Sequence, residues 1–146
     1  MSLQNWLANG WLRPHQTDLQ EISGLLAIVD RDISDAQSKD LSVDWKFGIA
    51  YNAALKLCTM MLYAAGYRSE NALAHYRTLA SIEYTMGEEY HVDAIYLNTC
   101  RAKRNTIEYD NVGVASQTEA DELLAFVHKL RADVLNRLAN QYPALQ

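Results

Sequence analysis

Cysteine is scarce in this sequence, and long apolar runs are absent. Of the 146 residues two are cysteines, Cys58 and Cys100, which lie far apart within helical patterns. This usage excludes a disulfide scaffold and a zinc site, and it indicates free thiols in a reducing compartment. No stretch of about eighteen apolar residues marks a membrane span, and no charged start followed by an apolar run marks a signal peptide. We therefore expect a cytoplasmic protein without membrane contact.

Positive charge is also in short supply. The net charge is -5, with 49% hydrophobic and 21% charged residues, a composition that excludes a disordered chain. The negative balance argues against sequence-independent nucleic-acid binding over the whole surface. It leaves room for a local basic patch, and Arg101, Lys103 and Arg104 are the one tight cluster of positive charge.

Strand-like alternation, internal repeats and low-complexity tracts are missing from the sequence. Apolar residues instead recur at helical spacing, which predicts helices over about 17–35, 42–67, 70–86, 89–110 and 116–142. The predicted fold is all-α, an up-and-down antiparallel bundle of four to five long helices. The bundle is expected to be a single domain over 17–146. Residues 1–16 are expected to be an N-terminal capping segment, with a partner-binding arm as the alternative.

Local signals predict where several helices begin and which faces they bury. Capping boxes are expected at Thr17, with Gln20, and at Ser116, with Glu119. Asp30, Arg31 and Asp32 are assigned to the solvent face of the first long helix. The helix over 89–110 is expected to bury one face that carries Val92, Ile95, Tyr96, Thr99 and Ala102.

The second long helix, over 42–67, is apolar almost all round and carries one narrow polar stripe. Asn52, Lys56, Thr59 and Tyr63 follow one another at helical spacing. Two interpretations stay open. The stripe is a strip of solvent exposure, or it lines a cleft or subunit interface beside the polar run described next.

The densest polar run in the chain covers residues 101–110. On a helix Arg101, Asn105 and Glu108 stack on one side, and Arg104 lies one turn from Glu108. Guanidinium, amide, carboxylate and the phenol of Tyr109 in this arrangement can grip a phosphate or arrange a proton transfer. A solvated helix end is the alternative.

Metal and nucleophile signatures are incomplete. A di-metal carboxylate bundle needs two Glu-x-x-His pairs, and only Glu88 with His91 supplies one. No serine elbow or phosphate-binding glycine loop is present, and neither cysteine has a histidine nearby in sequence. No metal and no cofactor is expected.

Several short motifs together resemble the HEPN domain family, over roughly 17–142. They are Asp44-Trp45-Lys46 leading into Tyr51-Asn52-Ala53-Ala54, the Gly66-Tyr67 stop, His75, and Lys103-Arg104-Asn105. The resemblance implies a helical bundle that usually dimerises through the helices carrying the polar motif. Many members are metal-independent ribonucleases, often toxins or defence proteins, and others bind RNA or nucleotides without catalysis.

The chain departs from the motif of the active members at its histidine. Arg104 and Asn105 match the arginine and the polar residue, but Tyr109, Asp110 and Asn111 occupy the positions where histidine is required. Tyrosine, with an ordinary pKa of about 10, is a poor base at neutral pH. A carboxylate at Glu108, one turn from Arg104, is held ionised and weakly basic.

The resemblance thus predicts a cytoplasmic HEPN-like homodimer that binds RNA or a nucleotide without efficient cleavage. Arg101, Lys103 and Arg104 would contact phosphate, and Asn105 would orient a ligand oxygen or Arg104. Glu108 and Tyr109 would position these groups. Lys56 and Tyr63 are expected to complete the cleft.

Two rival hypotheses come from other classes. In the first, Glu108 or His75 replaces the missing histidine, and the protein is a metal-independent ribonuclease. In the second, it is a non-enzymatic dimeric interaction protein or a toxin–antitoxin partner of a protein from a neighbouring gene.

Overall fold

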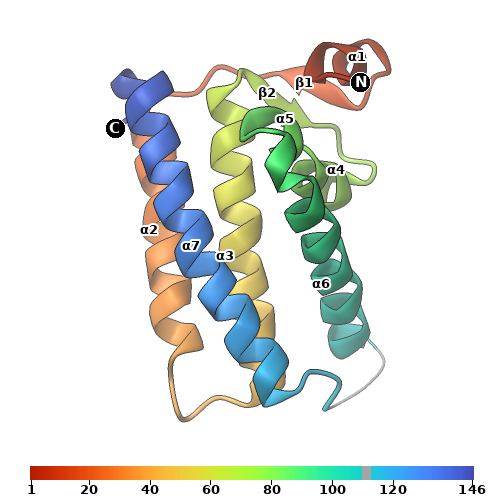
Figure 1. Cartoon of the computed structure of the whole chain (residues 1–146), viewed down its shortest axis with the longest axis vertical. Coiled ribbons are helices and arrows are strands. Elements are labelled where there is room, and N and C mark those ends of the chain that lie inside the picture. The colour runs from red at the N-terminus through yellow and green to blue at the C-terminus, as the bar shows by residue number, and fades with distance from the viewer. Residues whose placement is uncertain (110–112) are drawn as a thin grey trace.

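The fold is known from a computed structural model that describes residues 1–109 and 113–146, without the side chains of Glu108 and Tyr109. Four long helices dominate it: α2 (Leu19–Ala36), α3 (Val43–Ala64), α6 (His91–Tyr109) and α7 (Gln117–Gln141). Successive long helices run in opposite directions (Figure 1). The prediction of an all-α antiparallel bundle is confirmed.

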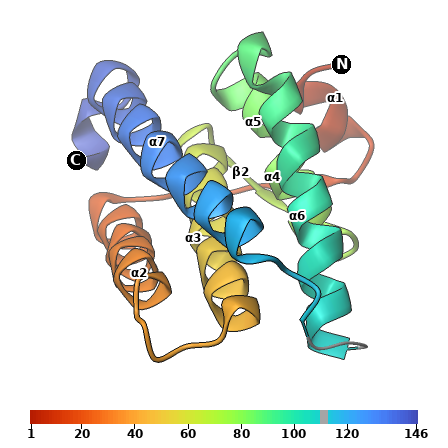
Figure 2. The ribbon, with the colours of Figure 1, turned by 60° about the horizontal axis from the view of Figure 1, so that its bottom comes forward.

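The central helix of the bundle is α3, which packs against α2, α7 and α6. Seen from the lower end of the bundle, it lies between α2 and α6, with α7 crossing over it (Figure 2). Its sequence is apolar almost all round, so it can bury side chains against all these neighbours. Its fully or nearly buried residues are Phe47, Ala50, Tyr51, Ala53, Ala54, Leu55, Leu57, Cys58, Met60, Met61 and Leu62.

The helix starts follow the capping rules, with one shift. Ser116 and Glu119 form the predicted capping box at the start of α7. The cap of α2 is Asp18, whose side chain accepts a hydrogen bond from the backbone N–H of Glu21. The prediction of a capping box at Thr17 is therefore wrong. The Thr17 hydroxyl instead donates to the carboxylate of Glu21, over 2.8 Å.

The predicted helix over 70–86 is broken into shorter elements. Strand β2 (Tyr67–Ser69) pairs antiparallel with β1 (Leu12–Pro14). The chain is therefore extended just before the predicted start of this helix at residue 70. Helices α4 (Ala74–Ala80) and α5 (Ile82–Thr85) and the 3-10 helix η1 (Glu88–Tyr90) follow. The break between α4 and α5 lies at the buried Ser81, whose hydroxyl bonds the carbonyl oxygen of Thr78 over 2.7 Å. Periodicity alone did not reveal this local competition for the backbone.

The N-terminal segment lies across one end of the bundle (Figure 1). Helix α1 (Leu3–Ala8) buries Trp6 together with Leu12 and Leu62 in a small satellite core. The Trp6 ring makes edge contacts with Trp11 and Tyr84, at centroid distances of 5.9 and 5.3 Å. At the other terminus the chain closes with the 3-10 helix η2 (Pro143–Leu145).

The buried face of α6 differs from the predicted one. Ala94, Leu97 and Cys100 are buried, whereas Val92 is 71% and Ile95 is 57% exposed. The stripe of Val92, Ile95, Thr99 and Ala102 thus points away from the core, and Ala94, Leu97 and Cys100 face the core instead. In the described part of the chain, no helix is long and apolar enough to cross a membrane.

Candidate phosphate-binding site

Arg104 lies where α6 passes α3. Its Cζ atom is 5.6 Å from the centroid of the Tyr51 ring, in a cation–π contact. Its Cγ atom is 4.0 Å from the point where a Cβ atom at Gly48 would lie. The side chain therefore runs along the surface of α3 and brings a fixed positive charge to it.

A groove of about 660 Å³ lies beside Arg104, within the size range of ligand pockets. It is bounded by residues of α2, of the first half of α3 and of the last turns of α6. The lining residues are Arg31, Asp32, Ser42, Asp44, Trp45, Gly48, Ile49, Asn52, Arg104 and Ile107.

Three cations act electrostatically on His75, the second residue of α4. The pKa of His75 is lowered, first because the ring is partly desolvated and then because the charges of Arg104, Lys56 and Arg101 oppose its protonation. Lys56 comes from α3 and both arginines come from α6. Three elements thus bring Lys56, His75, Arg101 and Arg104 within electrostatic reach of one another; we call these four residues the cationic cluster.

Tyr51 lies beneath the cationic cluster. It is 1% exposed, and its hydroxyl has no hydrogen-bond partner among the described residues. Burial raises the pKa of Tyr51 to about 12, although the charges of Arg104 and Arg101 work in the opposite direction. The phenol is therefore protonated at neutral pH and cannot serve there as a general base.

Arg101 is held by two contacts on the α6 and α4 surfaces. Its Nε–H donates to Asn98 Oδ1 over 2.9 Å, and its Cζ atom lies 5.7 Å from the Tyr76 ring centroid. Both contacts leave the guanidinium its charge, because neither partner is an anion. Arg101 is available to the cationic cluster as a second fixed cation.

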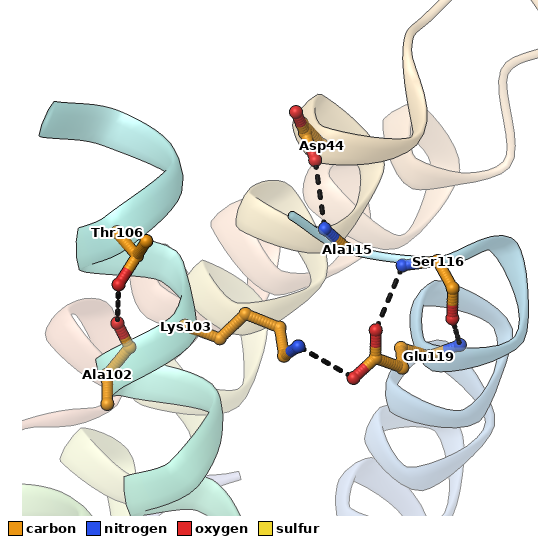
Figure 3. A network of polar contacts seen from close by, with 7 residues as sticks. All are labelled: Asp44, Ala102, Lys103, Thr106, Ala115, Ser116 and Glu119. Carbon is orange, nitrogen blue, oxygen red and sulfur yellow. Dashed lines mark hydrogen bonds and ion pairs between the residues drawn. The ribbon is translucent and has the colours of Figure 1, made fainter. Parts of the chain in front are cut away.

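Lys103 turns toward α7, away from the groove. Its Nζ atom forms an ion pair with Glu119 Oε2 over 2.7 Å (Figure 3). The same carboxylate accepts a hydrogen bond from the backbone N–H of Ser116, so it closes the capping box as well. Lys103 was expected to contact phosphate beside Arg101 and Arg104. The structure instead gives it a helix-tethering contact, because consecutive helical residues point about 100° apart.

The polar stripe of α3 does not act as one cleft. Asn52 donates to Asp32 over 2.6 Å and lines the groove, and Lys56 belongs to the cationic cluster. Tyr63 lies near the other end of α3, with its ring 4.1 Å from that of His15. The structure thus places Lys56 with Arg104 and places Tyr63 apart from them.

The remaining predicted site residues are on the last turns of α6. Asn105 is half-buried. Glu108 and Tyr109 belong to the helix by their backbone, but their side chains lie outside the described part of the structure, as do Asp110 and Asn111. Their predicted roles stay predictions.

Asp32 was assigned to solvent, but it is 4% exposed. Its carboxylate accepts hydrogen bonds from Asn52 and from the guanidinium of Arg31, the latter over 3.1 and 3.2 Å. The spacing holds the missed signal, because Asp32 falls on the same helical face as Val29 and Ala36, both buried. A buried carboxylate with these partners is a rigid wall of the groove.

Asp44, which the sequence analysis also did not single out as a site residue, anchors the chain that leads into α7. Its carboxylate accepts hydrogen bonds from the backbone N–H groups of Gly113, over 2.6 Å, and Ala115, over 3.2 Å. Figure 3 shows the second of these bonds beside the Lys103–Glu119 pair. The Asp44 bonds tie the start of α3 to the chain that leads into α7, and the Lys103–Glu119 pair ties α6 to α7.

Metal-binding geometry is not found in the described residues, where no three His, Cys, Asp or Glu side chains are grouped to hold an ion. The residues of the cationic cluster can together attract an anion. A comparison with known protein families, with curated proteins and with solved structures finds no match for this chain.

Proposed function

We propose that the chain is a HEPN-like protein that binds RNA or a nucleotide by its phosphate groups, without efficient cleavage. The observation that carries this proposal is that Arg104 lines a groove of ligand size, while Arg104, Arg101 and Lys56 all act electrostatically on His75. A chain with a net charge of -5 gathers three permanent cations from two helices at one place.

Electrostatics supports phosphate as the ligand. Like charges held together repel one another, and an anion placed between them relieves that repulsion. The guanidinium forks of two arginines match the oxygens of a phosphate group. Desolvation is the first cause of the lowered pKa of His75, and the charges of Arg104, Lys56 and Arg101 lower it further.

Poor cleavage follows from the groups at the site. The position of the motif histidine holds no histidine, and Tyr51 is kept protonated by its burial. Without an effective general base, rates typically fall by about 10²–10⁴-fold. The HEPN family, which the chain resembles, includes members that bind RNA or nucleotides without catalysis.

The test is binding of a fluorescently labelled single-stranded RNA to the full chain over a series of salt concentrations. We expect affinity to fall steeply with salt because phosphate contacts release counterions. Arg104→Ala should weaken binding and flatten the slope by about one unit. Arg137→Ala removes the same charge from α7, where Arg137 lies 3.9 Å from Glu89, and should leave both unchanged. An affinity that is independent of salt would overturn the proposal.

A metal-independent ribonuclease is the second candidate, and the place of His75 favours it. The lowered pKa leaves its imidazole neutral at pH 7, in the form that accepts a proton, beside Arg104 and Lys56. RNA cleavage in the presence of chelator, lost in His75→Gln and in Arg104→Ala, would establish this activity. Intact RNA under the same conditions would leave binding as the function.

The homodimer that the resemblance implies finds support in the outer face of α6. Val92 and Ile95 are exposed there on the helix that carries the polar motif, and paired apolar faces drive association. Sedimentation equilibrium of the full chain and of Ile95→Glu tests this point. A monomer in both samples would contradict it.

A further inference from the structure

Trp45 stands exposed at the rim of the groove. It lies in the first turn of α3, is 67% exposed, and belongs to the lining that includes Arg104. A single exposed apolar residue needs no explanation. An indole at the edge of a ligand-sized groove that also holds a guanidinium is different, because this is the pair that binds a base and a phosphate.

The face of α3 inside the groove is shaped to receive a flat group. Trp45, Gly48 and Asn52 follow one another on this face over about 10 Å. Gly48 has no side chain, and a Cβ atom there would meet only the Arg104 Cγ atom, at 4.0 Å. Glycine inside a helix costs about 0.5–1 kcal/mol relative to alanine. At this place it leaves the floor of the groove open beside the indole.

The wall opposite, on α2, is polar, and Asp32 ties it to Asn52 of α3. Asn52 donates to Asp32 over 2.6 Å, and the same carboxylate accepts from Arg31. The amide is thereby oriented with its nitrogen toward Asp32, so Asn52 Oδ1 is left as an acceptor for a ligand. A groove whose polar groups are fixed before binding loses little entropy when a ligand enters.

We propose that the groove seats an unpaired nucleobase of the bound RNA or nucleotide, stacked on Trp45, while Arg104 and the cationic cluster hold its phosphate. This inference rests on the proposed function and adds the base subsite to it. Arg104 joins the two parts because it lines the groove and also acts on His75. The site then prefers single strands, since a paired base cannot leave its stack without cost.

A second copy of the chain is the competing occupant, and the charges argue against it. A two-fold contact over the groove would bring Arg31 and Arg104 of both copies into one buried interface. Burial of charged side chains between two protein copies is costly even where they are paired, as Arg31 is with Asp32. A nucleotide instead brings negative charge to this face of the protein, and its base covers the indole.

The experiment compares a single-stranded RNA hexamer with an abasic hexamer of equal charge. Both are titrated into the full chain, Trp45→Ala, Trp45→Phe and Arg104→Ala, with binding followed by anisotropy of a label on the RNA. We expect Trp45→Ala to weaken hexamer binding by about 5- to 100-fold, as loss of base stacking does. Trp45→Phe should restore most of it, and the abasic hexamer should bind Trp45→Ala and the wild type equally.

Gly48→Leu provides a second variant. Its side chain would fill the floor of the groove, while Trp45 itself is kept. It should weaken the hexamer and spare the abasic strand. Equal hexamer affinity of Trp45→Ala and wild type, with binding still lost in Arg104→Ala, would overturn the base subsite and leave the phosphate site standing. A changed oligomeric state of Trp45→Ala at unchanged hexamer affinity would assign the groove to a second copy. Failure of the wild type to bind either strand would overturn the proposed function itself.

Discussion

The guanidinium of Arg104 lies over the ring of Tyr51, with its Cζ atom 5.6 Å from the ring centroid. The two residues come from different helices, α6 and α3, and meet where the groove adjoins the cationic cluster. The ring face offers the cation a favourable quadrupole, and burial of the ring fixes its orientation. This contact thus fixes the place of the Arg104 guanidinium at the edge of the groove.

Tyr51→Phe is expected to leave stability unchanged or to raise the free energy of unfolding by about 1 kcal/mol. The hydroxyl is buried and has no partner among the described residues, and an unpaired buried polar group costs about 1–3 kcal/mol. Phenylalanine keeps the ring beneath Arg104. Urea denaturation of both proteins measures the difference. A loss of 2 kcal/mol or more would show that the hydroxyl has a partner that the account lacks.

Lys103→Ala and Arg101→Ala form a matched pair, since each removes one positive charge from α6. Lys103 is paired with Glu119, so its loss should change RNA affinity less than about twofold and stability by about 0–1 kcal/mol. Arg101 acts on the cationic cluster, so its loss should lower affinity and reduce the salt slope by about one unit. Titration at several salt concentrations separates them. Equal losses from both variants would contradict the different places given to these side chains.

Asp44→Ala is expected to lower the free energy of unfolding by about 1–3 kcal/mol. The substitution leaves the backbone N–H groups of Gly113 and Ala115 without their acceptor. Asp93→Ala is the control, because Asp93 is likewise an acidic residue in the first turn of a long helix, α6. It should show only the loss of a helix-dipole contact, about 0.3–1 kcal/mol. Comparable losses in the two variants would refute the anchoring role of Asp44.

His75 should make stability depend on pH below about 6.5. Its pKa is lowered in the folded state from an ordinary value of 6.5, so the unfolded chain binds a proton first. The contribution is fully present above pH 6.5 and is lost as the pH falls toward the folded-state pKa. The lowered pKa values of Glu21, Glu70 and Glu119 act in a separate window, below 4.5.

Denaturation midpoints at pH 7.5 and 5.5 test this effect in the wild type and in His75→Gln. The wild type should lose more stability than His75→Gln between the two pH values, and the other three histidines are common to both proteins. Parallel losses would mean that the pKa of His75 is not lowered in the folded state.

The long helices were predictable because their signals are local. The apolar periods of α2 and α7 and the capping box at Ser116 act within a few residues of the chain. The structure of the region over 67–86 was not predictable in this way. Strand β2 is extended because it pairs with β1, which lies more than fifty positions earlier in the chain. A strand partner so far away in the sequence leaves no mark in a periodicity.

The site was predictable in part for the same reason. The run from Arg101 to Arg104 pointed to α6, which contributes to the candidate site, but two neighbouring residues of that helix make different contacts. Lys103 meets Glu119 on α7 and Arg104 meets Tyr51 on α3, and only the packing of three helices decides this. The misjudged face of α6 has a similar cause, since Ala94 and Cys100 lie against the core and leave Ile95 outside. Small residues permit a close approach of helices that a hydrophobicity pattern does not weigh.

The most direct test of the central claim is the pKa of His75, measured by NMR titration of its ring signals with and without a saturating single-stranded RNA. Desolvation lowers this pKa first, and phosphate bound among Arg104, Arg101 and Lys56 would neutralise the charges that lower it further. The account predicts that RNA raises the pKa of His75, and that Arg104→Ala raises it in the free protein. A pKa of His75 that does not rise when the RNA binds would place the ligand elsewhere and contradict the account.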